Sequence, residues 1–173
     1  GMCLARLALA RIATGDTVSG AALLSDPLLD GTRQQAFVEI DVTLARIALS
    51  LAEGDAAEAL ELAEAAVARL RQTNGIIWLP PVLDARARAL LALGRPAEAH
   101  DALAAAVAVA RSAGARGMLW SHLAQLADVQ EQLGDGAAAD TRREADTEWH
   151  SLLENTWPEA LRQALITSRG QRP

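Results

Sequence analysis

Three histidines are the side chains of this chain best suited to hold a metal ion or to transfer a proton near neutral pH. His100, His122 and His150 are separated by 22 and 28 residues, whereas two metal ligands on one helix face lie about four residues apart. A metal site would therefore require the fold to bring three helices together. We interpret these histidines as surface or partly buried imidazoles and predict no metal site.

Acidic residues are numerous enough that two of them could meet as a general acid and base. Most of them, such as Glu58, Glu61 and Glu64, recur at a spacing that places them on the solvated face of a helix. No nucleophile-elbow pattern and no His-Glu-x-x-His pair occurs. Because the chain has no lysine, it also lacks a phosphate-binding loop that ends in Lys-Ser or Lys-Thr. We predict no catalytic residues, no cofactor and no enzymatic activity.

The single cysteine and the charge pattern restrict the chemistry further. Cys3 has no partner for an internal disulfide or a thiolate cluster, and we predict that it is a small buried apolar residue rather than a reactive thiol. The net charge is −6, with acidic and basic residues interspersed. Without a basic face the chain is a poor partner for nucleic acid.

The N-terminus shows no sign of a targeting or membrane segment. Arg6 and Arg11 interrupt the apolar residues too often for a secretory signal. The longest uncharged helical run, residues 102–110, is far shorter than the roughly 20 residues that a bilayer needs. We expect a soluble, cytoplasmic protein that does not bind membranes. Gly1 before Met2 is typical of a tag remnant, and the apolar pattern starts at once, so we expect a fragment of a longer protein.

Composition indicates which elements must position these residues. Apolar residues make up 51% of the 173, but aromatic residues only 3%, so the apolar side chains are mostly Ala and Leu, which favour helices. No segment alternates with period two in the manner of a strand. The sequence predicts an all-α protein with a single domain over residues 1–173.

Four glycines, each closing an apolar helical stretch, follow one another at separations of 39, 40 and 40 residues: Gly15, Gly54, Gly94 and Gly134. Glycine can adopt the left-handed backbone that ends a helix, and the Asp that follows three of them can cap the next helix. A period of this size is typical of helical repeats, whose units bury their apolar faces against their neighbours. We predict helix pairs over about residues 2–31, 32–75, 76–115 and 116–155, and a cap helix over about 157–169.

Local signals refine these boundaries. Asp26-Pro27 predicts that the second helix is short or kinked, and Asp55 with Glu58 forms a capping-box pattern. Asn74-Gly75 predicts a turn. Prolines in a first helical turn are expected at the starts of two helices: Pro80, Pro81 and Pro96. Thr156-Trp157-Pro158-Glu159 predicts the start of the last helix.

The four tryptophans, Trp78, Trp120, Trp149 and Trp157, stand near helix starts and near the last turn. We interpret them as core residues or as contacts between repeats. An exposed tryptophan would instead indicate an interface.

Small residues recur at fixed distances from the turn glycines. Five residues after the glycine stand Ala59, Ala99 and Ala139, and twelve residues after it stand Ala66 and Ala106, with Asp146 in the fourth unit. Seven residues before it stand Ala8, Ile47, Ala87 and Ala127. This pattern resembles the tetratricopeptide repeat, whose helix pairs pack through small residues at these offsets. The resemblance implies a right-handed α-solenoid of antiparallel helix pairs.

The chain departs from that family in several ways. Its repeat is longer by about six residues, the aromatic residue before the turn and the closing proline are missing, and Arg46 and Arg86 stand where the family prefers a large apolar residue. We expect the stems of these arginines to lie along the edge of the core. Longer units rich in Ala, Leu and Arg are similar to the helical-repeat regions of large bacterial ATP-dependent regulators, such as LuxR-type activators and some adenylate cyclases.

The resemblance also implies where a partner would bind. In such arrays the first helix of each pair lines the concave side, and the corresponding positions are apolar in the first two units but polar in the last two. The polar candidates for partner binding are Asp84, Arg88, Ser121, Asp128 and Glu131, and a groove of this kind suits an amphipathic peptide. Arg88 could equally pair with Asp84 or with Asp128, which would require no ligand.

These observations predict a non-enzymatic module for protein–protein contact or autoregulation within a larger bacterial regulator. The main alternative is a domain that senses a small-molecule effector, and an uncharacterised enzyme ranks lowest. The partner would be a protein or peptide, including other domains of the same polypeptide. A homodimer through the N-terminal end is also expected, because the stack would expose Leu4 and Leu7 there.

Overall fold

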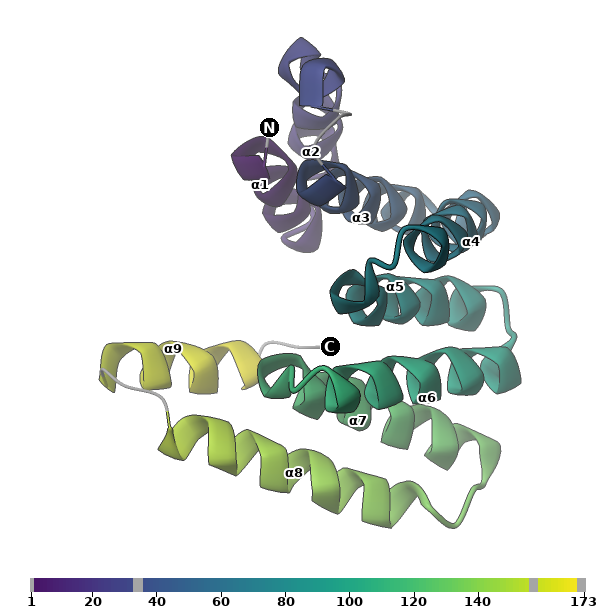
Figure 1. Ribbon diagram of the computed structural model, residues 1–173, viewed down its shortest axis with the longest axis vertical. Coiled ribbons are helices and arrows are strands. Elements are labelled where there is room, and N and C mark those ends of the chain that lie inside the picture. The colour runs from purple at the N-terminus through teal and green to yellow at the C-terminus, as the bar shows by residue number, and fades with distance from the viewer. Residues whose placement is uncertain (1, 33–35, 156–158, 171–173) are drawn as a thin grey trace. The chain divides into compact units, whose positions relative to one another are not determined.

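The computed structural model describes residues 2–32, 36–155 and 159–170, and over that part of the chain every regular element is a helix (Figure 1). The all-α prediction is therefore confirmed. The elements are α1 (Met2–Ala13), α2 (Thr17–Leu24), η1 (Pro27–Thr32), α3 (Ala36–Glu53), α4 (Ala56–Gln72), η2 (Ile76–Trp78), α5 (Leu79–Ala92), α6 (Pro96–Ser112), α7 (Arg116–Leu133), α8 (Ala138–Glu154) and α9 (Glu159–Gly170); η1 and η2 are short 3-10 helices.

The structure divides into two compact units, unit 1 (Gly1–Val109) and unit 2 (Ala110–Pro173). Over the described residues, no helix combines the length and the apolar content needed to cross a bilayer.

The turns between paired helices share one backbone geometry. All four periodic glycines have positive φ angles, between 71° at Gly94 and 87° at Gly54. The residue after each glycine donates its N–H to the carbonyl five residues earlier, at 2.8–2.9 Å. The Schellman motif has two hydrogen bonds, which satisfy carbonyls at a helix end, and this is the one that spans more residues. The prediction that these glycines end helices is confirmed.

Side-chain caps start two of the following helices, α2 and α4. Asp55 accepts a bond from the backbone N–H of Glu58 at 2.9 Å, as the capping pattern predicts. In a complete capping box the Glu58 side chain would also accept from the backbone N–H of Asp55. Here Glu58 Oε2 accepts from the Ser50 hydroxyl on α3 at 2.8 Å. The cap thus also ties α4 to α3.

The predicted breaks lie where helices end or begin. Helix α2 ends at Leu24, and the 3-10 helix η1 starts at Pro27. Prolines occupy the first turn of α5, and Pro96 begins α6. Residues 156–158 of the last capping pattern, including Trp157, lie outside the described residues, and α9 begins at Glu159.

Unit 1 is built from contacts between neighbouring helices. Helix α1 packs against α2 and α3, α3 packs against α4 and α5, and α4 packs against α5 (Figure 1). One apolar cluster gathers around Ala8, Ile12 and Ala45, and a second around Leu70, Val82 and Ala106. The buried carboxylate of Asp41 on α3 is satisfied by Arg6 on α1, whose Nε donates to it at 3.0 Å.

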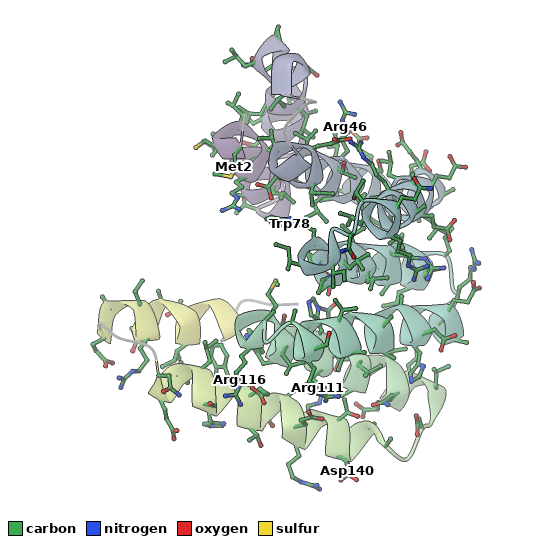
Figure 2. The ribbon with its side chains drawn as sticks, in the orientation of Figure 1. Met2, Arg46, Trp78, Arg111, Arg116 and Asp140 are labelled. Atoms are coloured by element: carbon green, nitrogen blue, oxygen red, sulfur yellow. The ribbon has the colours of Figure 1, made fainter. Side chains whose placement is uncertain are left out.

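Unit 2 contains the packed pair α7 and α8 (Figure 1). Two buried tryptophans meet between them, since the ring centroids of Trp120 and Trp149 are 4.5 Å apart in a tilted arrangement. The prediction of a packing role is confirmed for these two. Ion pairs from Arg111 to Glu144 and from Arg116 to Glu148 also join segments of this unit; both arginines are labelled in Figure 2.

The periodic small residues are buried as their spacing predicts, with one exception. Ala8, Ile47, Ala87 and Ala127 are all fully buried, and so are Ala59 and Ala99. Their equivalent Ala139 is exposed. Helices α4 and α6 begin two residues after the turn glycine, whereas α8 begins four residues after it. Ala139 therefore sits nearer the start of its helix than its counterparts do.

The prediction for Cys3 is wrong, because Cys3 is exposed. The buried residues of α1 are Ala5, Ala8 and Ile12. Successive helical residues are about 100° apart, so Cys3, two positions before Ala5, points to the opposite side. The low polarity of cysteine did not reveal which face of α1 would be covered.

Candidate functional site

Two of the predicted partner-binding residues, Asp84 and Arg88, lie one turn apart on α5 in unit 1. Nε of Arg88 lies 3.3 Å from Oδ2 of Asp84. The arginine side chain is half exposed, while that of Asp84 is mostly covered. Of the pairings considered from the sequence, the structure contains the one within the helix. Half of the Arg88 side chain is exposed, so its guanidinium group is also accessible to a partner.

The other three predicted residues lie on α7 in unit 2. Arg142 of α8 donates to the carboxylate of Asp128, and the same guanidinium group lies 3.8 Å from Oε2 of Glu131. The Ser121 hydroxyl donates to the carbonyl of Met118 on its own helix at 2.8 Å. The guanidinium group of Arg142 thus brings Asp128 and Glu131 together, and both acidic side chains remain well exposed.

Sequence reasoning missed Arg142, although a signal was present. It stands eight residues after its turn glycine, where the preceding units have Leu62 and Ala102. An arginine at a position that is otherwise apolar indicates a local polar partner. Its guanidinium also reaches the carbonyl of Ala124 on α7, at 3.4 Å.

The histidines lie in three helices. His122 on α7 is buried, His100 on α6 lies 3.3 Å from the carboxylate of Asp101, and the ring of His150 on α8 lies 2.7 Å from the carbonyl of Asp146. Within the described ranges, no three side chains of the metal-binding types come together.

A pocket that the sequence did not predict lies in unit 1, where the end of α4 and η2 meet α3. Its volume is about 390 Å³, and its lining is Glu39, Ile40, Arg69, Leu70, Thr73, Asn74, Gly75, Ile76, Ile77 and Trp78. We call it the α3–α4 pocket. Ile40 and Leu70 are buried, and Trp78, labelled in Figure 2, is half-buried. Ile76 and Ile77 are exposed.

The pocket wall depends on an unusual turn. Asn74 has a φ of 56°, and the Gly75 N–H donates to the carbonyl of Leu70 at 2.8 Å. Asn74 therefore has the role that glycine has in the four periodic turns, which asparagine tolerates better than other residues. A Cβ at Gly75 would lie 2.7 Å from a methyl group of Leu70. The Asn-Gly turn was predicted, and its close approach to Leu70 explains why glycine follows.

The polar part of this pocket is an ion pair between Arg69 of α4 and Glu39 of α3. The hydroxyl of Thr73 donates to the carbonyl of Arg69 at 3.0 Å, which holds the last turn of α4 in place. The α3–α4 pocket therefore combines an apolar interior with one basic and one acidic group. Its lining contains no Cys, Ser, His or Lys side chain.

Two further pockets in unit 1 are lined by more polar side chains. One, of about 410 Å³, includes Arg46, Ser50, Glu53 and Glu58 beside Leu24 and Leu49. The other, of about 250 Å³, includes Arg71 and the ion pair between Arg86 and Glu64, which are 3.2 Å apart. In these pockets the Ser50–Glu58 hydrogen bond joins α3 to α4, and the Arg86–Glu64 pair joins α5 to α4.

Comparison with family models, with curated proteins and with solved structures gives no match for this chain. The function that its surfaces support must therefore be argued from their geometry.

Proposed function

We propose that this protein is a non-enzymatic binding module, a right-handed array of antiparallel helix pairs that docks a protein or peptide within a larger bacterial regulator in the cytoplasm. The observation that carries this proposal is that residues at the same position of each repeat are buried alike. Ala8, Ile47, Ala87 and Ala127 stand at one repeat position, and each is fully buried. Arrays of repeated helix pairs use their extended surfaces for binding.

The polar residues on α5 in unit 1 and those on α7 in unit 2 are each a docking surface in this proposal. Asp84 and Arg88 form an ion pair on α5, and Asp128 and Glu131 are two acidic residues on α7. Both helices are first helices of predicted repeats. The pairs that Arg142 makes with Asp128 and Glu131 are exposed, and exposed ion pairs contribute little to stability, so a partner can replace these at small cost. Charges of this kind mainly fix partner choice and orientation. Asp128 and Glu131 share one arginine, so this surface carries net negative charge and suits a basic face of an amphipathic helix.

A charge reversal tests this proposal. Arg88→Glu should abolish recovery of the stoichiometric partner that co-purifies with the tagged protein from its own organism. The variant should be less stable than the wild type, because the mostly covered Asp84 loses its cation, so partner recovery is compared at a temperature where the variant is folded. Circular dichroism checks the fold, and mass spectrometry measures the recovered partner.

Arg143→Glu is the matched control. Arg143 lies on α8, is exposed, and pairs with Asp140 of its own helix at 2.8 Å. Its reversal changes the same charge and breaks an ion pair within one helix, here with an exposed carboxylate, at a position outside the predicted surface. Equal losses for the two variants, or an unchanged partner with Arg88→Glu, would count against docking at these residues.

A second candidate function, sensing of a small-molecule effector, is favoured by the α3–α4 pocket. Its volume of about 390 Å³ falls within the ~300–1,000 Å³ typical of ligand sites. An effector that binds the folded state raises the melting temperature, and the rise continues with the logarithm of its concentration above the Kd. This candidate is lost if no small molecule changes the melting temperature.

A further inference from the structure

We propose that the α3–α4 pocket binds a small amphipathic carboxylate, with its apolar body against Ile40, Leu70 and Trp78 and its carboxylate on Arg69. The proposal rests on the effector-sensing candidate and deepens it by naming the ligand class. It uses none of the residues assigned to protein docking.

The interior of the pocket determines the apolar half of the ligand. Ile40 and Leu70 form a buried floor, and Trp78 provides an aromatic wall. Ile77, with 61% of its surface exposed, and Ile76, with 46%, add apolar area that the protein alone leaves in water. A ligand that covers these side chains removes that area from water, which favours binding.

The rim determines the charge of the ligand. A guanidinium group has five N–H donors, and one carboxylate engages two of them at most. The Arg69 side chain is 55% exposed although it is paired, whereas that of Glu39 is 25% exposed. Donors of Arg69 therefore remain accessible to a second carboxylate. The amide of Asn74, which also lines the pocket, can contribute further donors.

An organic cation is the rival ligand class, because the end of α4 carries partial negative charge and Trp78 offers an aromatic face. Two carbonyls at this helix end are already satisfied, that of Arg69 by the Thr73 N–H and that of Leu70 by the Gly75 N–H. The carboxylate of Glu39 is engaged by Arg69. Within that ion pair the Arg69 side chain is 55% exposed and the Glu39 side chain 25%, so an incoming head group meets the guanidinium group first.

The test compares three probes with the same chain length and different head groups: octanoate, octanol and octylammonium. Calorimetric titration of the purified protein measures their affinities. Octanoate should bind most tightly. The indole N–H signal of Trp78 should shift in NMR spectra on addition of octanoate, because this ring lines the pocket.

Three variants separate the charge effects. Arg69→Gln should weaken octanoate binding about tenfold, the effect of losing one charge-assisted hydrogen bond. Glu39→Gln should strengthen it, because the competing carboxylate is removed. Arg71→Gln is the matched control on the same helix, since Arg71 lines the smaller pocket with Glu64 and Arg86. Its affinity for octanoate should equal that of the wild type.

Opposite results overturn the proposal. It fails if Arg69→Gln and Arg71→Gln bind octanoate equally well, if octylammonium binds more tightly than octanoate, or if no probe binds the wild type. Partner recovery by the Arg88→Glu variant is a separate measurement. Loss of the carboxylate site therefore leaves the docking proposal standing, and loss of docking leaves the carboxylate site standing.

Discussion

At the scale of single residues, left-handed backbone positions determine where the helices of this protein end. The periodic glycines all adopt positive φ, and an added Cβ at Gly94 would meet no atom within 4 Å. The requirement for glycine there is therefore one of backbone conformation and not of space. Asn74 meets the same requirement at the turn that forms the α3–α4 pocket.

Two alanine substitutions isolate this backbone effect. Gly94→Ala should lower the free energy of unfolding by roughly 1–2 kcal/mol, because Ala is strained in the left-handed region. Gly117→Ala should raise it by up to about 1 kcal/mol, because Gly117 lies inside α7 with open space around its Cα. Urea denaturation measures both. A stable Gly94→Ala variant would show that another residue sets this turn.

At the scale of elements, caps matter most for the shortest helices, since isolated helices of fewer than ~12 residues are marginal. Helix α2 has 8 residues and begins after Asp16, which accepts a bond from the Ser19 N–H at 3.1 Å. Hydrogen bonds from the side chain and backbone of Ser19, with a smaller effect of Arg11, hold the pKa of Asp16 below its ordinary value.

This lowered pKa predicts a pH dependence of stability. A carboxylate with a depressed folded-state pKa stabilises the protein fully above its unfolded pKa of about 3.9, and the effect is lost as pH falls through the lower folded pKa. Asparagine caps helices about as well as aspartate but does not titrate. The stability advantage of wild type over Asp16→Asn should therefore shrink as pH falls below about 4.

Urea denaturation between pH 6 and pH 3 measures that difference. NMR titration of the Asp16 carboxyl gives its pKa directly. Ser19→Ala should move the pKa of Asp16 upward, because a hydrogen bond to the carboxylate is lost. A difference in stability that stays constant down to pH 3 would contradict this role of Asp16.

At the scale of the whole molecule, one pattern of small residues recurs in both units. Ala87 in unit 1 and Ala127 in unit 2 occupy the same repeat position, and both are fully buried. The pattern breaks after the fourth turn, where the later start of α8 leaves Ala139 exposed while its equivalent Ala99 is fully buried. Repeat position alone therefore does not determine burial.

The same substitution at these two equivalent positions tests that conclusion. Ala99→Leu should destabilise the protein by about 1–3 kcal/mol, because a larger side chain does not fit a filled core. Ala139→Leu should change stability by less than about 0.5 kcal/mol. Thermal or urea unfolding distinguishes the two. Similar costs would mean that Ala139 is covered in solution.

The polar candidates show the limit of sequence reasoning about the site. Arg88 pairs with Asp84 on its own helix, which was one of the two pairings that the sequence left open. Arg142 joins Asp128 and Glu131 from another helix, which no local spacing predicts. Cys3 was misplaced for a related reason, since its residue type does not reveal which side of α1 is covered.

The sequence by itself determined the all-helical class, most helix ends, the turn glycines and the small residues that become buried. These features depend on backbone preferences and on neighbours within a few positions, so they are legible along the chain. Only the tertiary structure decided that Glu39 meets Arg69, thirty residues away, and that Ile40 and Trp78 enclose one pocket with them. Such contacts depend on how each helix is rotated about its axis and on which helices become neighbours, and local spacing does not encode either.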